Sequence, residues 1–189
     1  MSDFLLALIG AALANNLALL VPLGIDPALR ATGPRGRLHA LGLATSLVLA
    51  LTLPLALLLD LWLLQPLQAQ SLRTWAVLSS AAVLIGPCLA LLRRLRPALP
   101  VDGLGPLILL NGGLLGWPLQ APDASLVQAL AWGLGGGLGF WLVLLLYTDL
   151  LERIDPAHVP LPFRGAPMVL LSAGLMGVAL LGFAGMGRP

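Results

Sequence analysis

Few side chains in this sequence have the types and spacing that chemistry needs, and most of them lie within apolar stretches. Asn15, Asn16 and Asn111 interrupt runs of leucine, alanine and glycine, and Asp26 follows the first of these runs. A buried amide needs a hydrogen-bond partner, so each asparagine caps a broken helix, joins two helices or lines a path for ions or electrons. Asp26 is either an intramembrane carboxylate with a function or an acid at the membrane surface. Asp60 is expected at the membrane surface.

Several catalytic and metal-binding chemistries are excluded by residues that the sequence lacks. It contains no lysine, so it has neither the lysine of a phosphate-binding P-loop nor one that forms a Schiff base. Cys88 is its only cysteine, which excludes an intrachain disulfide, a four-cysteine zinc site and an iron–sulfur site held by this chain alone. His39 and His158 lie far apart in predicted polar connections, and no Ser-His-Asp set is expected. We therefore predict no catalytic residue and no metal site.

A glycine-rich run, Gly133 to Gly139, has the composition of a nucleotide-binding loop but not its spacing. No glycine in it starts a G-x-G-x-x-G pattern, and the run lies inside an apolar stretch instead of after a strand. Gly133 with Gly137, and Gly135 with Gly139, are four residues apart. This spacing predicts close packing against a neighbouring helix.

The composition indicates a membrane protein. Of its 189 residues, 59% are hydrophobic and 10% are charged, against about 25% charged residues in ordinary soluble domains. Six apolar stretches are each long enough, or nearly so, to cross about 30 Å of hydrocarbon as a helix. They are Phe4–Leu23, Leu41–Leu64, Thr74–Leu92, Leu104–Leu119, Ser125–Tyr147 and Ala166–Met186. We predict an all-α integral membrane protein with six transmembrane helices in a single domain, 1–189, with no room for a soluble catalytic domain.

The arginine positions predict the orientation in the membrane. Eight of the ten arginines fall in the connections after the first, third and fifth stretches, whereas Arg73 and Arg188 lie on the other side. The positive-inside rule places the eight-arginine side in the cytoplasm and both termini outside. No basic residue precedes the first stretch, so we expect it to be a retained helix and not a signal peptide. The basic residues lack interleaved aromatic residues, so no nucleic-acid partner is expected.

The first and fourth stretches resemble each other. The run 15–23 aligns with the run 111–119 at an offset of 96, with an asparagine, two leucines and a proline in common, and Arg73 aligns with Arg164 at an offset of 91. Because three is an odd number, the second copy of a three-helix unit starts on the opposite side of the membrane and must run in the opposite direction. We therefore predict an inverted 3+3 repeat, about 1–96 and 97–189, with interrupted helices one and four meeting at a midplane site. The alternative is that leucine- and glycine-rich sequence matches itself by composition.

Residues spread over the whole chain match one family of membrane subunits. They are Asp3, Leu5-Leu6, Gly10, Asn15-Asn16, Leu23-Gly24, Pro27, Gly42-Leu43-Ala44-Thr45, Leu72-Arg73-Thr74, Asn111, Leu115-Gly116, Glu152-Arg153, Val159-Pro160, Pro162-Phe163-Arg164-Gly165, Ser172-Ala173-Gly174-Leu175-Met176 and Gly182-Phe183. On these residues the chain resembles the six-helix membrane subunits of the Rnf and Na⁺-translocating NADH:quinone reductase complexes, most closely the Rnf A subunit and its Nqr E counterpart. The resemblance implies an inverted repeat with outside termini.

The resemblance also implies a mechanism and partners. In this family two subunits of opposite orientation pair, and each gives two cysteines, one from each half-helix, to a [2Fe–2S] cluster at the midplane of the bilayer. The cluster relays electrons across the membrane while the complex moves Na⁺ or H⁺. The implied partners are a homologous, oppositely oriented subunit, the flavin- and iron–sulfur-bearing subunits of the same complex, and the lipid bilayer.

The sequence departs from the family at both cysteine positions. These positions are Asp26 and Gly112 here, and Cys88 occupies neither of them. An aspartate can in principle ligate iron, but a glycine has no side chain. We therefore predict that this chain cannot supply its half of the cluster site, and that it binds no cofactor alone.

Together these features lead us to expect a membrane subunit of an Rnf-type complex, which couples electron transfer on partner subunits to cation translocation. It would act as scaffold and conduit in the bacterial cytoplasmic membrane. Asn15, Asn16 and Asn111, with Asp26 and Gly112, would line the midplane between the half-helices. The alternative is a non-redox inverted-repeat carrier or assembly protein that kept the fold and lost the cluster.

Overall fold

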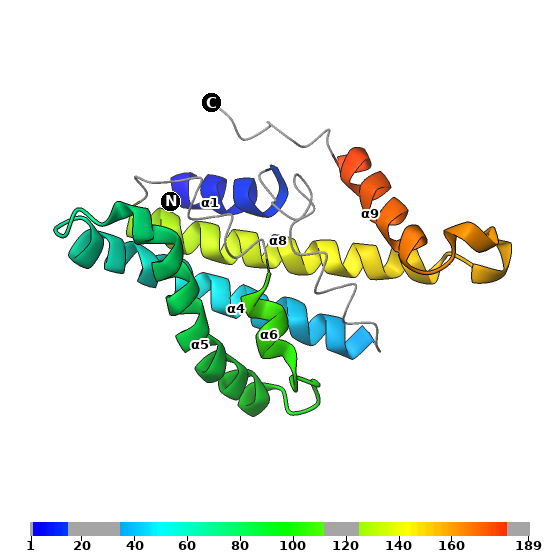
Figure 1. Ribbon diagram of the computed structural model, residues 1–189, viewed down its shortest axis with the longest axis horizontal. Helices are drawn as coiled ribbons and strands as arrows, with labels where there is room; N and C mark the ends of the chain where they lie inside the picture. The colour runs from blue at the N-terminus through cyan, green and yellow to red at the C-terminus, as the bar shows by residue number, and fades with distance from the viewer. Residues whose placement is uncertain (1, 15–34, 112–124, 181–189) are drawn as a thin grey trace.

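Figure 1 shows the computed structural model of the chain, in which residues 2–14, 35–111 and 125–180 are described. These residues form helices and short connections, with no strand among them. The predicted all-α class is therefore confirmed for this part of the chain.

The helices of the described residues differ greatly in length. The long helices are α4 (Arg35–Leu59), continued by a π-helical segment (Asp60–Leu64), α5 (Arg73–Leu95) and α8 (Leu126–Glu152). The shorter helices are α1 (Ser2–Ile9), continued by a π-helical segment (Gly10–Ala14), α6 (Leu104–Leu109) and α9 (Ala166–Leu180). Short 3₁₀ turns at Gln70–Leu72, Pro156–His158 and Leu161–Phe163 lie in the connections.

Three helical segments are long and apolar enough to cross a membrane: Gly36–Leu64, Gln70–Leu95 and Leu126–Glu152. They correspond to the second, third and fifth predicted spans. The described parts of the first, fourth and sixth predicted spans are shorter, and the remainder of each lies outside the described residues. The predicted start of the fifth span at Ser125 is confirmed, because this serine and Gln128 form a capping box at the first turn of α8.

Helix α8 packs against α4 along one side and against α1 along another (Figure 1). Glycine allows both contacts. A Cβ on Gly133 would lie 2.7 Å from the carbonyl oxygen of Leu49, and Cβ atoms on Gly137 and Gly135 would collide with Ser46 of α4 and Leu8 of α1. The predicted packing function of the glycine run is confirmed, since only residues without a Cβ allow the backbones to approach so closely.

The buried core lies between α4, α5 and α6 and continues into α8. Its fully buried members include Leu41 and Val48 of α4 and Leu104 and Ile108 of α6. Helix α9 contacts the C-terminal part of α8 (Figure 1), and its Met176 packs against the edge of this core. Many large apolar side chains on α5 and α9 are exposed, as expected for surfaces that face lipid or other subunits.

Candidate functional site

Of the five residues predicted to line a midplane site, the structure describes one. Asn111 is fully buried, immediately beyond the end of α6. Asn15, Asn16, Asp26 and Gly112 lie outside the described residues. The described part of the chain therefore does not bring any two of the predicted site residues together.

The two helices expected to be interrupted both lose regular α-helical geometry just before an asparagine. Helix α6 ends at Leu109, after only 6 residues, two positions before Asn111. Helix α1 changes at Gly10 to a π-helical segment that reaches Ala14, the residue before Asn15. A π-helical segment within an apolar helix is uncommon and is often found at functional sites.

Asp60 has a partner that the sequence did not indicate. Its carboxylate is buried, with its side chain 3% exposed, and forms an ion pair with Arg73. Arg73 donates from Nη2 to Oδ2 at 2.6 Å and from Nε to Oδ1 at 3.1 Å, and Gln65 Nε2 lies 3.3 Å from Oδ2. The π-helical turn that starts at Asp60 and the short connection to α5 bring the two charges together. Such a two-pronged pair fixes both partners in one geometry.

Arg164, which the proposed repeat aligns with Arg73, also fixes a connection. Its Nε donates to the carbonyl oxygen of Val159 at 2.8 Å, and its Nη2 donates to that of Ala157 at 3.2 Å. Each arginine directly follows a 3₁₀ turn and stands at or just before the start of a helix. The two arginines thus hold two connections through different acceptors.

Metal-binding groups are scarce. Within the described ranges, no three His, Cys, Asp or Glu side chains are grouped so that they could hold a metal ion. Cys88 is buried in α5, 2% exposed, among apolar neighbours of the core. A [2Fe–2S] cluster requires thiolate ligands, and this cysteine stands neither at position 26 nor at position 112. The donor set of this chain therefore does not fit the [2Fe–2S] cluster that the resemblance implies.

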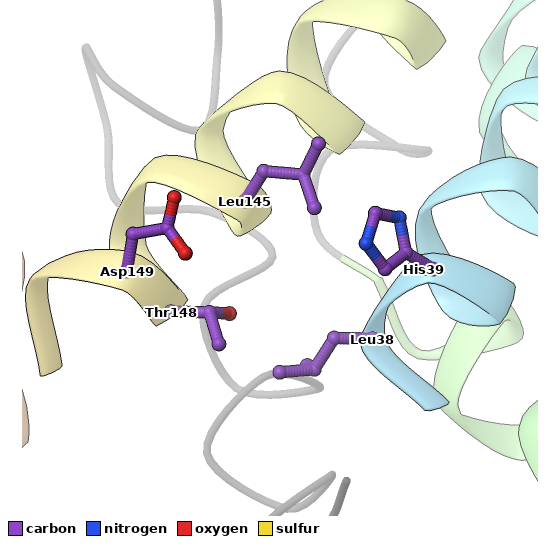
Figure 2. Close-up of a pocket in the computed structure, with 5 residues that line it drawn as sticks. All are labelled: Leu38, His39, Leu145, Thr148 and Asp149. Atoms are coloured by element: carbon purple, nitrogen blue, oxygen red, sulfur yellow. The ribbon is translucent and has the colours of Figure 1, made fainter. Parts of the chain in front are cut away.

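The structure also contains a pocket with both polar and apolar lining that the sequence did not predict. Leu38 and His39 of α4 and Leu145, Thr148 and Asp149 of α8 line it (Figure 2). His39 was expected in a polar connection, but it lies within α4, because that helix begins at Arg35 instead of Leu41. His39 and Asp149 are 110 positions apart, and no motif links them, so only the packing of α4 on α8 reveals the pocket.

Comparisons with known proteins give one consistent result. Residues 4–187 match the family described as "Rnf-Nqr subunit, membrane protein". The chain is 36% identical to the A subunit of the ion-translocating oxidoreductase complex of Aliivibrio fischeri, over 98% of each chain. It is 37% identical to the corresponding proteins of Actinobacillus pleuropneumoniae, over 98% of each chain, and Histophilus somni, over 100% of each chain.

Proposed function

Because the chain belongs to the Rnf-Nqr family of membrane subunits, we propose that it is a subunit of an Rnf-type complex that couples electron transfer on partner subunits to the translocation of Na⁺ or H⁺. The full-length similarity to subunits named for such a complex carries this proposal. The partners are a homologous subunit of opposite orientation and the flavin- and iron–sulfur-bearing subunits.

The inverted 3+3 repeat belongs to this proposal. It is supported by the loss of α-helical geometry before Asn15 and Asn111, and by the two arginines that follow 3₁₀ turns. The central contact of the antiparallel helices α4 and α8 (Figure 1) also fits, because these are the second helices of the two proposed repeats. In this arrangement Asn15, Asn16, Asn111, Asp26 and Gly112 line the space between the half-helices.

The chain acts in this complex as scaffold and conduit, and its own side chains do not ligate a cluster. Position 112 has no side chain, and the lone thiol belongs to Cys88 in α5. The same observation favours a second candidate function: an assembly protein or carrier of the same fold that has lost the redox role.

Redox-driven ion uptake by membrane vesicles tests the first function against the second. Vesicles that contain the complete complex should take up cations when the electron donor is added. Vesicles from a strain that lacks only this chain should lose that uptake. Uptake that persists without the chain, in vesicles that still assemble the other subunits, would exclude a coupling subunit and leave the second function.

The missing cluster has its own test. Iron content and low-temperature EPR spectra are measured on the reduced complex, purified with its partner subunits. We expect no [2Fe–2S] signal assignable to this subunit, and a new signal in the double variant Asp26→Cys with Gly112→Cys. The variant Cys88→Ser is the control. A signal in the unmodified complex that disappears with Cys88→Ser would show that Cys88 is a ligand after all.

A further inference from the structure

Three arginines gather at the C-terminal end of α5. Arg93 and Arg94 lie in its last turn, and Arg96 directly follows the helix. Arg93 forms an ion pair with Asp102, which is the only acidic residue between positions 93 and 104. Arg94 and Arg96 are exposed and form no ion pair within the described ranges. The described residues therefore leave two positive charges unneutralised at this end of the helix.

Arg94 stands at the end of an exposed apolar strip on α5. The buried residues of this helix share a face that packs on the rest of the chain: Val77, Ser80, Ala81, Ile85, Cys88 and Leu92. Arg94 follows Pro87 by seven positions and Val83 by eleven, a spacing that places the three on another face of the helix. Val83 is 70% exposed, and Pro87 is exposed as well. Leu91 and Leu95, 44% and 67% exposed, flank the strip at its arginine end.

The length of α5 places the arginines beside lipid headgroups. The helix has 23 residues and is about 35 Å long, whereas the hydrocarbon of a bilayer is about 30 Å thick. When α5 crosses a bilayer, its last turn therefore reaches the headgroup layer, and Val83 and Pro87 lie at the depth of the acyl chains. Figure 1 shows this end of α5 at the lower edge of the molecule, beside the connection to α6.

We propose that the arginine end of α5 binds an anionic phospholipid. Arg94 and Arg96 donate hydrogen bonds to the phosphate group, and an acyl chain lies along Leu91, Pro87 and Val83. A free phosphate would meet only exposed arginines, whose attraction is weakened by water and salt. An acidic soluble protein would leave the apolar strip unfilled. A phospholipid matches both the charge and the apolar surface. Such binding goes beyond the proposed function and requires no redox partner.

An exposed arginine at the end of α8 offers a matched control. Arg153 directly follows that helix, as Arg96 follows α5, and its side chain is exposed. Three acidic residues stand within four positions of it: Asp149, Glu152 and Asp155. These acids repel an anionic headgroup, so the loss of Arg153 should leave lipid binding unchanged.

Native mass spectrometry of the full chain in detergent measures the binding, with phosphatidylglycerol and phosphatidylcholine of identical acyl chains as probes. We expect phosphatidylglycerol to bind more tightly. Arg94→Gln should weaken its binding about fivefold, and Arg94→Gln with Arg96→Gln about 25-fold. Arg94→Lys, which keeps the charge, should retain most of the binding, and Arg153→Gln all of it. Equal binding of the two lipids, or equal losses in Arg94→Gln and Arg153→Gln, would overturn the proposal and leave the arginines to set the orientation or to contact an acidic protein.

Fluorescence quenching in lipid nanodiscs distinguishes a bound phospholipid from a bound phosphate. Leu91→Trp adds a fluorophore to the apolar strip, and the unmodified chain, with its five tryptophans, gives the background. Phosphatidylglycerol that carries bromine on its acyl chains should quench the added fluorescence at a lower mole fraction than brominated phosphatidylcholine. Soluble glycerol phosphate should not reverse the quenching. Reversal by glycerol phosphate would show a site for the phosphate alone, and equal quenching by the two lipids would show unselective lipid contact. Either result would overturn the proposal.

Discussion

At the scale of single residues, the pair between Asp60 and Arg73 joins a buried carboxylate to a guanidinium group. The charges lie at the junction of two helical segments that are long and apolar enough to cross a membrane, and a buried carboxylate without a counter-charge is costly. Asp60 is almost fully buried, and two hydrogen bonds join it to the guanidinium group. The pair therefore holds the end of α4 against the start of α5.

Replacing one member of this pair should destabilise the protein. We expect Arg73→Gln to lower the free energy of unfolding by about 3 kcal/mol, because it removes the positive charge that pairs with the buried carboxylate of Asp60. Asp60→Asn should cost less, because the side chain of Arg73 is partly exposed. Thermal unfolding in detergent measures the loss. Arg93→Gln is the matched control: Arg93 pairs with Asp102 where both side chains are largely exposed, so little change is expected. Equal effects at the two sites would show that the burial of Asp60 does not matter.

A hydroxyl group joins α9 to α8 in addition to their apolar contacts. Tyr147 donates from its hydroxyl to the carbonyl oxygen of Val169 at 2.6 Å. Tyr147→Phe keeps the ring and removes the hydrogen bond, so it should cost about 1 kcal/mol. The attachment of α9 should loosen before the rest unfolds, and limited proteolysis of the connection 153–165 should become faster. Unchanged proteolysis with unchanged stability would mean that apolar contacts around Ala173 alone hold α9.

At the scale of helices, close packing depends on glycine at particular positions of α8. Gly137→Ala should destabilise the protein by about 1–3 kcal/mol, because its Cβ would collide with the backbone of α4 at Ser46. Gly86→Ala in α5 is the matched control, since no atom lies within 4 Å of the Cβ position there. Thermal unfolding of the two variants in the same detergent should separate them, and similar unfolding temperatures would contradict the packing argument.

The comparison of predicted and observed helices shows what hydropathy can and cannot define. Hydropathy located the spans that correspond to α4, α5 and α8, because an uninterrupted apolar run must be helical in a membrane. It placed the start of α4 too late, at Leu41 instead of Arg35, and the end of α8 too early, at Tyr147 instead of Glu152. Hydropathy marks the part in hydrocarbon, whereas the helices continue through polar residues into the interface.

The pairs that arise from packing could not be predicted in the same way. The sequence places Asp60 near Trp62 and so suggests the membrane surface, but it does not indicate that Arg73 lies within hydrogen-bond distance. Neither His39 nor Asp149 belongs to a recognisable sequence motif. They line the same pocket because α4 and α8 lie side by side and antiparallel (Figure 1). Long-range contacts of this kind depend on three-dimensional packing, which local composition does not specify.

At the scale of the whole molecule, the orientation in the membrane decides which solution the His39 pocket meets. The arginine distribution predicts that the connection 96–103 lies in the cytoplasm and that the connection 65–72 lies outside. The two connections flank α5, which spans the membrane by its length and composition. Labelling the two ends of this one helix therefore tests both sides of the membrane.

Single cysteines at the two ends of α5 test this orientation. Cys88 is first changed to alanine, because it is the only cysteine, and Ser71→Cys or Ala98→Cys is then added at an exposed position. A thiol reagent that does not cross membranes should label the cysteine at position 71 in intact cells, and the one at position 98 only after the membrane is permeabilised. The reverse pattern would place the arginine-rich side outside. The pocket lined by His39 would then face the external solution.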